Sequence, residues 1–138
     1  MAVDGFESSL SSLRGATVEV SNSGLPPDPG AASVQLRFSS GTRLRVDYWR
    51  TVARGKAGVS SFDHGQRYGL PAPIDAFAEL RRVLSGRSVT EARWEPSTGD
   101  LVFVFDADIE FQAFNLTGYE VWEIHFPDGT GEYSNYAR

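Results

Sequence analysis

The sequence predicts an α+β fold, with two helices and mainly antiparallel sheets of about eight strands. Most of the chain consists of short segments in which apolar and polar residues alternate, as in antiparallel strands with one buried face. Only two segments, near 6–13 and 74–84, repeat apolar residues at helical spacing. The order of a helix followed by strands occurs twice, so we expect a pseudo-duplicated α-β-β-β-β unit, with halves at about 4–70 and 71–138.

The bulk composition indicates one soluble domain, residues 1–138. The chain is 41% hydrophobic and 22% charged, which is ordinary for a globular protein that buries its own core. It contains no cysteine, which excludes disulfides, thiolate chemistry and cysteine-ligated metals. No stretch approaches the roughly 18 apolar residues of a membrane span, and the first residues lack the pattern of a signal peptide. We expect a cytoplasmic protein with no membrane contact and no cofactor.

In the first half, Asp4 can cap a helix that Gly15 ends. The apolar stripe of this helix consists of Phe6, Leu10 and Leu13. A loop rich in proline and glycine occupies 21–33. Strands are expected at 16–20, 33–38, 42–49 and 56–62. The turn SSG joins the second and third of these strands into a hairpin with one solvent-exposed face.

In the second half, a loop at 63–73 leads into a helix at 74–86 that Gly86 ends. The apolar stripe of this helix consists of Ile74, Phe77, Leu80 and Leu84. Strands are expected at 88–95, 100–106, 108–114, 119–126 and 130–136. The segment LVFVF, residues 101–105, is apolar on both faces, which predicts a central strand covered on both sides, or on one side and by a partner chain.

The two halves align in three places. The paired segments are 10–20 with 80–92, 34–46 with 101–111, and SSFDHG (60–65) with IHFPDG (124–129). The alignment leaves open whether the halves form one long sheet or two packed sheets.

Alternation in 119–126 assigns three residues to the core: Trp122, Ile124 and Phe126. If Asp128 and Gly129 form a two-residue type I′ turn, the pairing of the hairpin follows by counting. Tyr133 then lies opposite Ile124 on the core side.

The same count places His125 opposite Glu132 on the outer face, with Glu123 nearby. A carboxylate–imidazole pair of this kind can act as a general base. We favour the alternative, a surface cross-strand pair worth about 0.2–1 kcal/mol. A catalytic histidine needs a nucleophile or ligand partner, and the only other histidine, His64, belongs to the other half.

The loop segment FDHGQRYG gathers five polar residues: Asp63, His64, Gln66, Arg67 and Tyr68. Loops carry binding residues more often than strands do, so this segment is the better binding candidate. The alternative is a self-contained turn in which Asp63 caps its own backbone and Tyr68 packs near Pro71. The repeat alignment matches this loop with the turn at 127–129, so we expect the two histidine-bearing tips to be counterparts.

Two charged clusters suggest other chemistries. Asp106, Asp108 and Glu110 would align for Mg²⁺ or Ca²⁺ on a continuous strand, but DAD is also typical of a hairpin tip, so we expect no metal. A basic cluster lies beside Tyr48 and Trp49: Arg37, Arg43, Arg45, Arg50, Arg54 and Lys56. Such clusters can bind single-stranded nucleic acid. We favour an ordinary solvent-exposed face over nucleic-acid binding, because the net charge is −5 and most of these residues occupy solvent-exposed positions of the hairpin.

Two segments carry resemblances. SSFDHGQRYGLPAPIDAFAELRRVLSG and NLTGYEVWEIHFPDGTGEYSNYAR are similar to small bacterial proteins of uncharacterised families. The hairpin at 119–129 also resembles the YE.WEI..PDG hairpins of small immunity proteins found beside secreted polymorphic toxins. This second resemblance implies tight binding to a toxin domain, often through an acidic surface, and supplies no catalytic residues.

These observations give three hypotheses. The first is a non-enzymatic protein-binding module, in its most concrete form an immunity-like inhibitor of a toxin. Its contacts would be the 63–68 loop and an acidic surface drawn from the second half: Asp106, Asp108, Glu110, Glu123 and Glu132. The second is a small-ligand or enzymatic domain with a pocket between the sheet and the helices. Its candidate lining residues are Asp63, His64, Arg67, Trp49 and His125. The third is nucleic-acid binding by the arginine-rich hairpin.

Overall fold

The structure is a computed structural model that describes residues 3–22 and 32–134. The helices are α1 (Val3–Ser11) and α2 (Ala76–Leu84), and two short 3₁₀ turns are η1 (Ser61–Asp63) and η2 (Asp106–Asp108). The strands are β1 (Val18–Asn22), β2 (Val34–Phe38), β3 (Arg43–Val46), β4 (Trp49–Ala53), β5 (Lys56–Ser60), β6 (Val89–Glu95), β7 (Asp100–Phe105), β8 (Ile109–Ala113), β9 (Trp122–His125) and β10 (Gly131–Tyr133). Most of the loop predicted at 21–33, and the end of the last predicted strand, lie outside the described residues.

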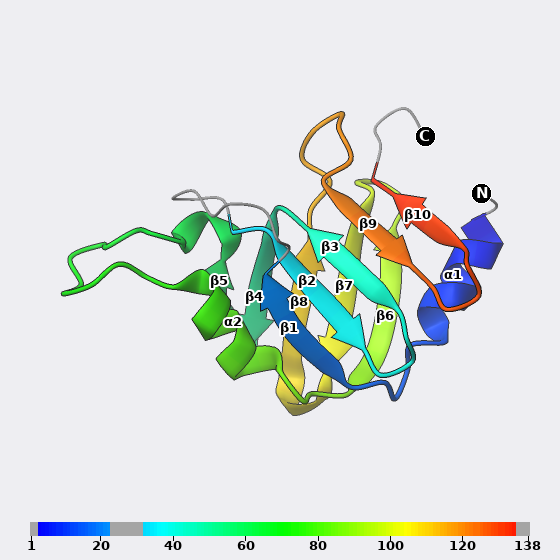
Figure 1. Cartoon of the computed structure of the whole chain (residues 1–138), viewed down its shortest axis with the longest axis horizontal. Coiled ribbons are helices and arrows are strands. Elements are labelled where there is room, and N and C mark those ends of the chain that lie inside the picture. The colour runs from blue at the N-terminus through cyan, green and yellow to red at the C-terminus, as the bar shows by residue number, and fades with distance from the viewer. Residues whose placement is uncertain (1–2, 23–31, 135–138) are drawn as a thin grey trace.

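The strands form two antiparallel sheets of five, one behind the other (Figure 1). The first sheet has the order β1-β2-β3-β9-β10 and the second the order β5-β4-β8-β7-β6. One hydrophobic core fills the space between them, where Phe38 of β2 stacks on Phe103 of β7 with ring centroids 5.7 Å apart. The predicted α+β class is confirmed, and the halves build two sheets rather than one.

Each helix covers a side of this sandwich (Figure 1). The stripe of α1 is buried as predicted, and Phe6 lies against Trp94 of β6 and stacks on Trp122 of β9. Helix α2 lies against β1 and buries Leu80 and Leu84. It is shorter than the predicted 74–86, because the side chain of Asp75 caps it by accepting a hydrogen bond from the backbone N–H of Ala78. Neither described helix is long and apolar enough to cross a membrane.

The predicted internal repeat is confirmed by the topology. The first half supplies the meander β1–β3 to the first sheet and the hairpin β4–β5 to the second sheet. The second half supplies the meander β6–β8 to the second sheet and the hairpin β9–β10 to the first. The halves meet through matching hydrogen bonds: Gly15 N–H donates to the carbonyl of Val89, and Gly86 N–H to that of Val18, both at 2.8 Å. Each unit contains five strands after its helix, one more than in the predicted α-β-β-β-β unit. The strand that the residue ranges missed is in the first half, since five ranges were expected in the second.

The two core tryptophans repeat the same local structure. The indole N–H of Trp49 donates to the carbonyl of Ala32 at 2.7 Å, and that of Trp122 donates to the carbonyl of Gly99 at 3.0 Å. The hydroxyls of two serines accept the backbone N–H groups of these tryptophans, both at 3.1 Å: Ser61 and Ser134. The repeat therefore extends to individual side chains.

The strand predicted at 42–49 is in fact two strands in different sheets. The chain leaves the first sheet after Val46, passes through Asp47 and Tyr48, and enters the second sheet at Trp49. Trp49 is fully buried there, and its indole N–H donates to the carbonyl of Ala32, which is 17 residues away in the sequence. The alternation of neighbouring residues does not reveal such a bond. The prediction missed β4 for this reason.

The register predicted for the last hairpin is wrong by one residue. His125 lies opposite Gly131, and Phe126 N–H donates to the carbonyl of Thr130, so three residues form the loop. Gly129 has a φ of +89° whereas Asp128 does not have a positive φ, which fits a three-residue loop and not a type I′ turn. Proline at the first loop position suits this geometry because its φ is fixed near −65°. Tyr133 is consequently on the outer face, opposite Glu123.

The alignment of 60–65 with 124–129 is also wrong. Ser61 and Ser134 make equivalent bonds, so Ser61 corresponds to Ser134, and His64 does not correspond to the turn at 127–129. The counterpart of the loop at 127–129 is the turn at Arg54 and Gly55 between β4 and β5. The two histidine-bearing tips are therefore not counterparts.

The apolar segment 101–105 lies in β7, between β8 and the edge strand β6. Leu101, Phe103 and Phe105 point into the core. On the outer face, Val102 is only 6% exposed and lies opposite Arg93 on one side and Gln112 on the other. The outer face of β7 is thus covered within this chain at Val102, whereas Val104 on the same face is partly exposed.

Candidate functional site

The predicted binding loop belongs to the β5–α2 connection, residues 61–75, which projects from one side of the molecule (Figure 1). At its start, Asp63 Oδ2 accepts the backbone N–H of Ser60 at 2.9 Å, while the hydroxyl of Ser60 accepts the N–H of Phe62 at 3.2 Å. This reciprocal capping box fixes the turn. The hydroxyl of Tyr68 donates to Asp63 Oδ1 at 3.0 Å, and this bond raises the pKa of Tyr68 above its ordinary value.

His64 accepts a hydrogen bond from the first turn of α2. Its Nδ1 accepts the backbone N–H of Ala76 at 3.2 Å, and its ring lies edge-on to Phe77 with centroids 5.0 Å apart. The first N–H groups of a helix have no partner within the helix, so the imidazole satisfies one of them. As an acceptor, Nδ1 carries no proton, so the neutral ring holds its proton on Nε2.

The rest of the loop closes on itself. Gly65 N–H donates to the carbonyl of Ile74, and Ile74 N–H donates to the carbonyl of Gln66, at 2.9 and 2.8 Å. The guanidinium of Arg67 donates to the carbonyl of Pro71 at 3.2 Å. These bonds match the self-contained turn that we considered as the alternative, except that Tyr68 bonds to Asp63 and leaves its ring 67% exposed.

The large apolar side chains that are exposed in the described part of the chain gather on two connections. Phe62, Tyr68 and Leu70 lie in the β5–α2 connection, whereas Leu116 and Tyr119 lie in the β8–β9 connection, residues 114–121. Neither the strands nor the two α-helices that the structure describes expose a side chain of this kind. In the repeat, the β8–β9 connection corresponds to the two residues between β3 and β4, so it is an insertion into the common framework.

Tyr48 links these two connections, through a ring contact with one and a backbone hydrogen bond with the other. The ring of Phe62 stacks on Tyr48 at 5.6 Å and 11°, and the carbonyl of Tyr48 accepts the backbone N–H of Phe114 at 2.8 Å. The guanidinium of Arg50 lies 5.3 Å from the centroid of the Phe114 ring. We call Phe62, Tyr48 and Phe114 the aromatic strip. Through Tyr48, it connects segments that are far apart in the sequence.

The second predicted cluster, on the last hairpin, is divided between two faces. His125 and Glu123 lie on the outer face, with His125 Nε2 4.0 Å from Glu123 Oε2. Glu123 also pairs with Arg45 at 3.4 Å, and the ring of His125 lies edge-on to Tyr133. Glu132 lies opposite Ile124, so the predicted cross-strand pair of Glu132 with His125 is not formed.

The acidic candidates are dispersed. Asp106 and Asp108 lie in η2, where Asp106 accepts the backbone N–H of Ser88 at 3.2 Å, while Glu110 lies on β8 and accepts a hydrogen bond from Gln112 at 2.7 Å. Among the residues that the structure describes, no group of three acidic or histidine side chains is placed to hold a metal ion. The η2 turn breaks the carboxylate alignment.

The basic candidates are also dispersed. Arg37, Arg43 and Arg45 project from the first sheet on the face opposite the core, whereas Arg50 lies on the outer face of the second sheet. Arg54 belongs to the β4–β5 turn, and Lys56 is the first residue of β5. The arginine-rich hairpin of the sequence therefore becomes two faces and a turn, because the chain changes sheets at residues 47–48.

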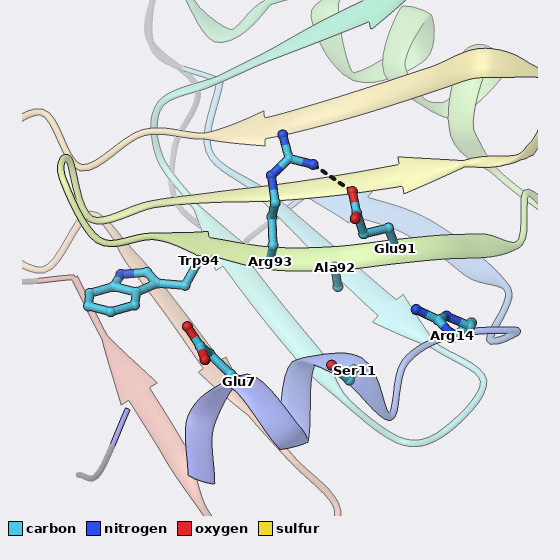
Figure 2. A pocket seen from close by; sticks show the side chains of 7 residues that line it. All are labelled: Glu7, Ser11, Arg14, Glu91, Ala92, Arg93 and Trp94. Atoms are coloured by element: carbon cyan, nitrogen blue, oxygen red, sulfur yellow. Dashed lines mark hydrogen bonds and ion pairs between the residues drawn. The ribbon is translucent and has the colours of Figure 1, made fainter. Parts of the chain in front are cut away.

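A groove that the sequence did not predict lies between α1 and β6 (Figure 2). It has a volume of about 240 Å³ and is lined by Glu7, Ser11, Arg14, Glu91, Ala92, Arg93 and Trp94. None of the predicted site residues belongs to it. The sequence contains one signal for it, since Glu7, Ser11 and Arg14 are polar residues at the helical spacing i, i+4 and i+7. In the structure, Glu7 and Ser11 lie on α1 and Arg14 lies in the turn that follows it.

Comparison of the chain with protein-family models, curated protein sequences and solved structures finds no match.

Proposed function

We propose that this chain is a protein-binding module whose main contact surface is the aromatic strip with the exposed apolar side chains beside it. The observation that carries the proposal is that the exposed large apolar side chains of the described residues lie on two connections. Phe62 is 49% exposed, Tyr68 67% and Tyr119 83%, and all lie on the two connections that the strip joins. Aromatic side chains presented on rigid elements are the usual anchors of protein interfaces, and arginine, here Arg50, is enriched beside them.

A binding role fits the polar residues better than catalysis does. His64 is held by α2, and His125 lies on an open sheet face against Tyr133. Asp63 is occupied by Ser60 and Tyr68. These side chains hold the projecting loop in shape, and a loop held in shape loses less conformational entropy on binding.

The first partner to test is a toxin domain encoded next to this chain, because the last hairpin resembles those of immunity proteins. The partner is immobilised and its affinity is measured for the wild-type chain and for Phe62→Ser, Tyr68→Ser and Tyr119→Ser. We expect each substitution to weaken binding by about tenfold, the effect of removing an interface anchor. Arg82→Ala, an exposed position on α2 away from the strip, is the matched control and should bind as the wild type does.

The decisive measurement uses a triple variant that combines Phe62→Ser, Tyr68→Ser and Tyr119→Ser. If it binds the partner with wild-type affinity, the aromatic strip is not the contact surface. If no protein encoded beside the chain binds it at all, the immunity-like form of the proposal fails. Circular dichroism on every variant confirms that the fold is retained.

A further inference from the structure

We propose that the groove between α1 and β6 binds an extended segment of a partner protein, which adds a strand to the open edge of β6. This inference rests on the proposed protein-binding function but uses a different surface from the aromatic strip. It follows from where the groove lies, which groups open into it, and how its charges are arranged.

The first step concerns position. Successive residues of a strand point to opposite faces, so Glu91 and Arg93 lie on the outer face, whereas Ala92 and Trp94 point to the core side. All four line the same groove. A groove that touches both faces of a strand must run along its edge, where the backbone N–H and C=O groups emerge.

The second step concerns the state of that edge. β6 is a seven-residue edge strand that pairs with β7 on one side. On its other side, the described bonds reach only Val89, which exchanges hydrogen bonds with Gly15 and Ala16. The equivalent edge in the repeat, that of β1, is met by a side chain, because Arg81 of α2 donates to the carbonyl of Val20 at 3.4 Å. In the described part of the chain, no side chain of α1 bonds to the edge of β6.

The third step concerns the side chains that line the groove. Trp49 and Trp122 donate their indole N–H groups to backbone carbonyls, whereas the described residues offer no acceptor to that of Trp94. The side chains of Glu7, Ser11 and Arg14 likewise have no hydrogen bond or ion pair within the described residues. Arg93 differs, since Glu95 and Glu91 pair with it at 2.7 and 2.6 Å and raise its pKa. A ligand therefore meets several groups that are not already engaged.

The fourth step concerns charge and length. Glu7 and Trp94 lie toward one end of the groove, and Arg14 lies toward the other (Figure 2). Glu7 lies on α1 and Arg14 lies in the turn that follows it, so the two opposite charges are spaced along the groove. The volume of about 240 Å³ is below the roughly 300–1,000 Å³ of pockets for drug-sized ligands, and a strand segment lying along an open edge suits it better.

These observations define the preferred segment. α1 runs antiparallel to β6, since Gly15 bonds to Val89 at one end while Phe6 contacts Trp94 at the other. All strand pairings of the described residues are antiparallel. A strand added to β6 in the same way passes Trp94 first and Glu91 last. A basic side chain then reaches Glu7 and the Trp94 ring, and an acidic side chain two residues later faces Arg14. The segment has the pattern basic–any–acidic.

The test uses the heptapeptide Thr-Val-Lys-Val-Glu-Val-Thr with blocked ends, titrated into the ¹⁵N-labelled full chain. We expect chemical-shift changes and slowed hydrogen exchange at the amides of residues 90–95. A peptide with lysine and glutamate exchanged should bind about three- to tenfold more weakly, the effect of two exposed ion pairs. The paired variant Glu7→Arg with Arg14→Glu should reverse this preference. N-methylation of alternate peptide residues should abolish binding, because it removes the donors of an added strand.

Several outcomes would overturn the inference. Equal binding of the two peptides would remove the charge assignment, and unaffected binding after N-methylation would remove the added strand. Absence of any change at 90–95 with millimolar peptide would remove the site. Slowed exchange of the same amides in a concentration-dependent dimer without peptide would assign the edge to a second copy of this chain. Phe62→Ser with Tyr68→Ser should leave peptide binding intact, so that failure of the aromatic strip and failure of the groove are told apart.

Discussion

His64 and His125 show how the surroundings of a residue decide its role. His64 lies beside the first turn of a helix and accepts the N–H of Ala76, so its imidazole replaces a missing backbone partner. His125 projects from a sheet face and packs against Tyr133. Gly131 permits this arrangement, since a Cβ there would lie 3.1 Å from His125 Nδ1. Residue type alone suggested a shared chemistry, but the neighbouring backbone gives each ring a separate structural task.

Tyr68 provides a prediction at the residue scale. Its hydrogen bond to Asp63 raises its pKa in the folded state, so the stabilisation is fully present below the unfolded tyrosine pKa near 10. That stabilisation is lost as the pH rises through the folded-state value. The difference between the wild-type and Tyr68→Phe phenolate titrations at 295 nm should therefore show a group that ionises above free tyrosine.

Asp63→Asn is the control for this titration. It removes the negative charge next to the phenol and should return Tyr68 to an ordinary tyrosine pKa. An unchanged titration in Asp63→Asn would mean that the Asp63 bond is not formed in solution.

At the scale of elements, the sequence predicts what local chemistry determines. Both helices and the hairpins with clear turns, SSG and PSTG, follow from apolar periodicity and turn residues. The step from β3 to β4 does not, because Asp47 and Tyr48 look like strand residues and Trp49 is drawn into the other sheet by distant partners. The register of the last hairpin failed because Pro127 extends the turn by one residue. The groove was not predicted because α1 and β6 are far apart in the sequence and come together only in the folded chain.

Two glycine substitutions test the hairpin register and the first helix. Gly131→Ala should destabilise the fold by about 1–3 kcal/mol, because the new Cβ would lie 2.8 Å from the carbonyl oxygen of Ile124. Gly5→Ala is the matched change in α1, where nothing lies within 4 Å of the new Cβ. It should stabilise the chain by about 0.5–1 kcal/mol. Urea unfolding measures both, and a neutral Gly131→Ala would contradict the observed register.

At the scale of the whole molecule, the two halves exchange hairpins. Each sheet takes three strands from one half and two from the other, and each helix packs against the first strand of the opposite half. The seam at Gly15 and Gly86 repeats the same bonds in both directions. A half by itself would leave one apolar face of its meander uncovered and its hairpin without a neighbouring strand. We infer that the stability of each half depends on the other.

Separate fragments 1–72 and 73–138 test this dependence. Each alone should give the poorly dispersed amide spectrum of an unfolded chain, and an equimolar mixture should recover the dispersed spectrum of the intact protein. A fragment that folds as a monomer would contradict the exchange of hairpins as the source of stability.

The exchange also changes what the projecting connection at 61–75 does. It is the tether between two interdependent units, and it sets the effective concentration at which one unit meets the other. Cleavage at its exposed tip, near Gly69, turns folding from a unimolecular reaction into an association of two chains. The unfolding midpoint of the nicked protein then rises with protein concentration, whereas that of the intact chain does not.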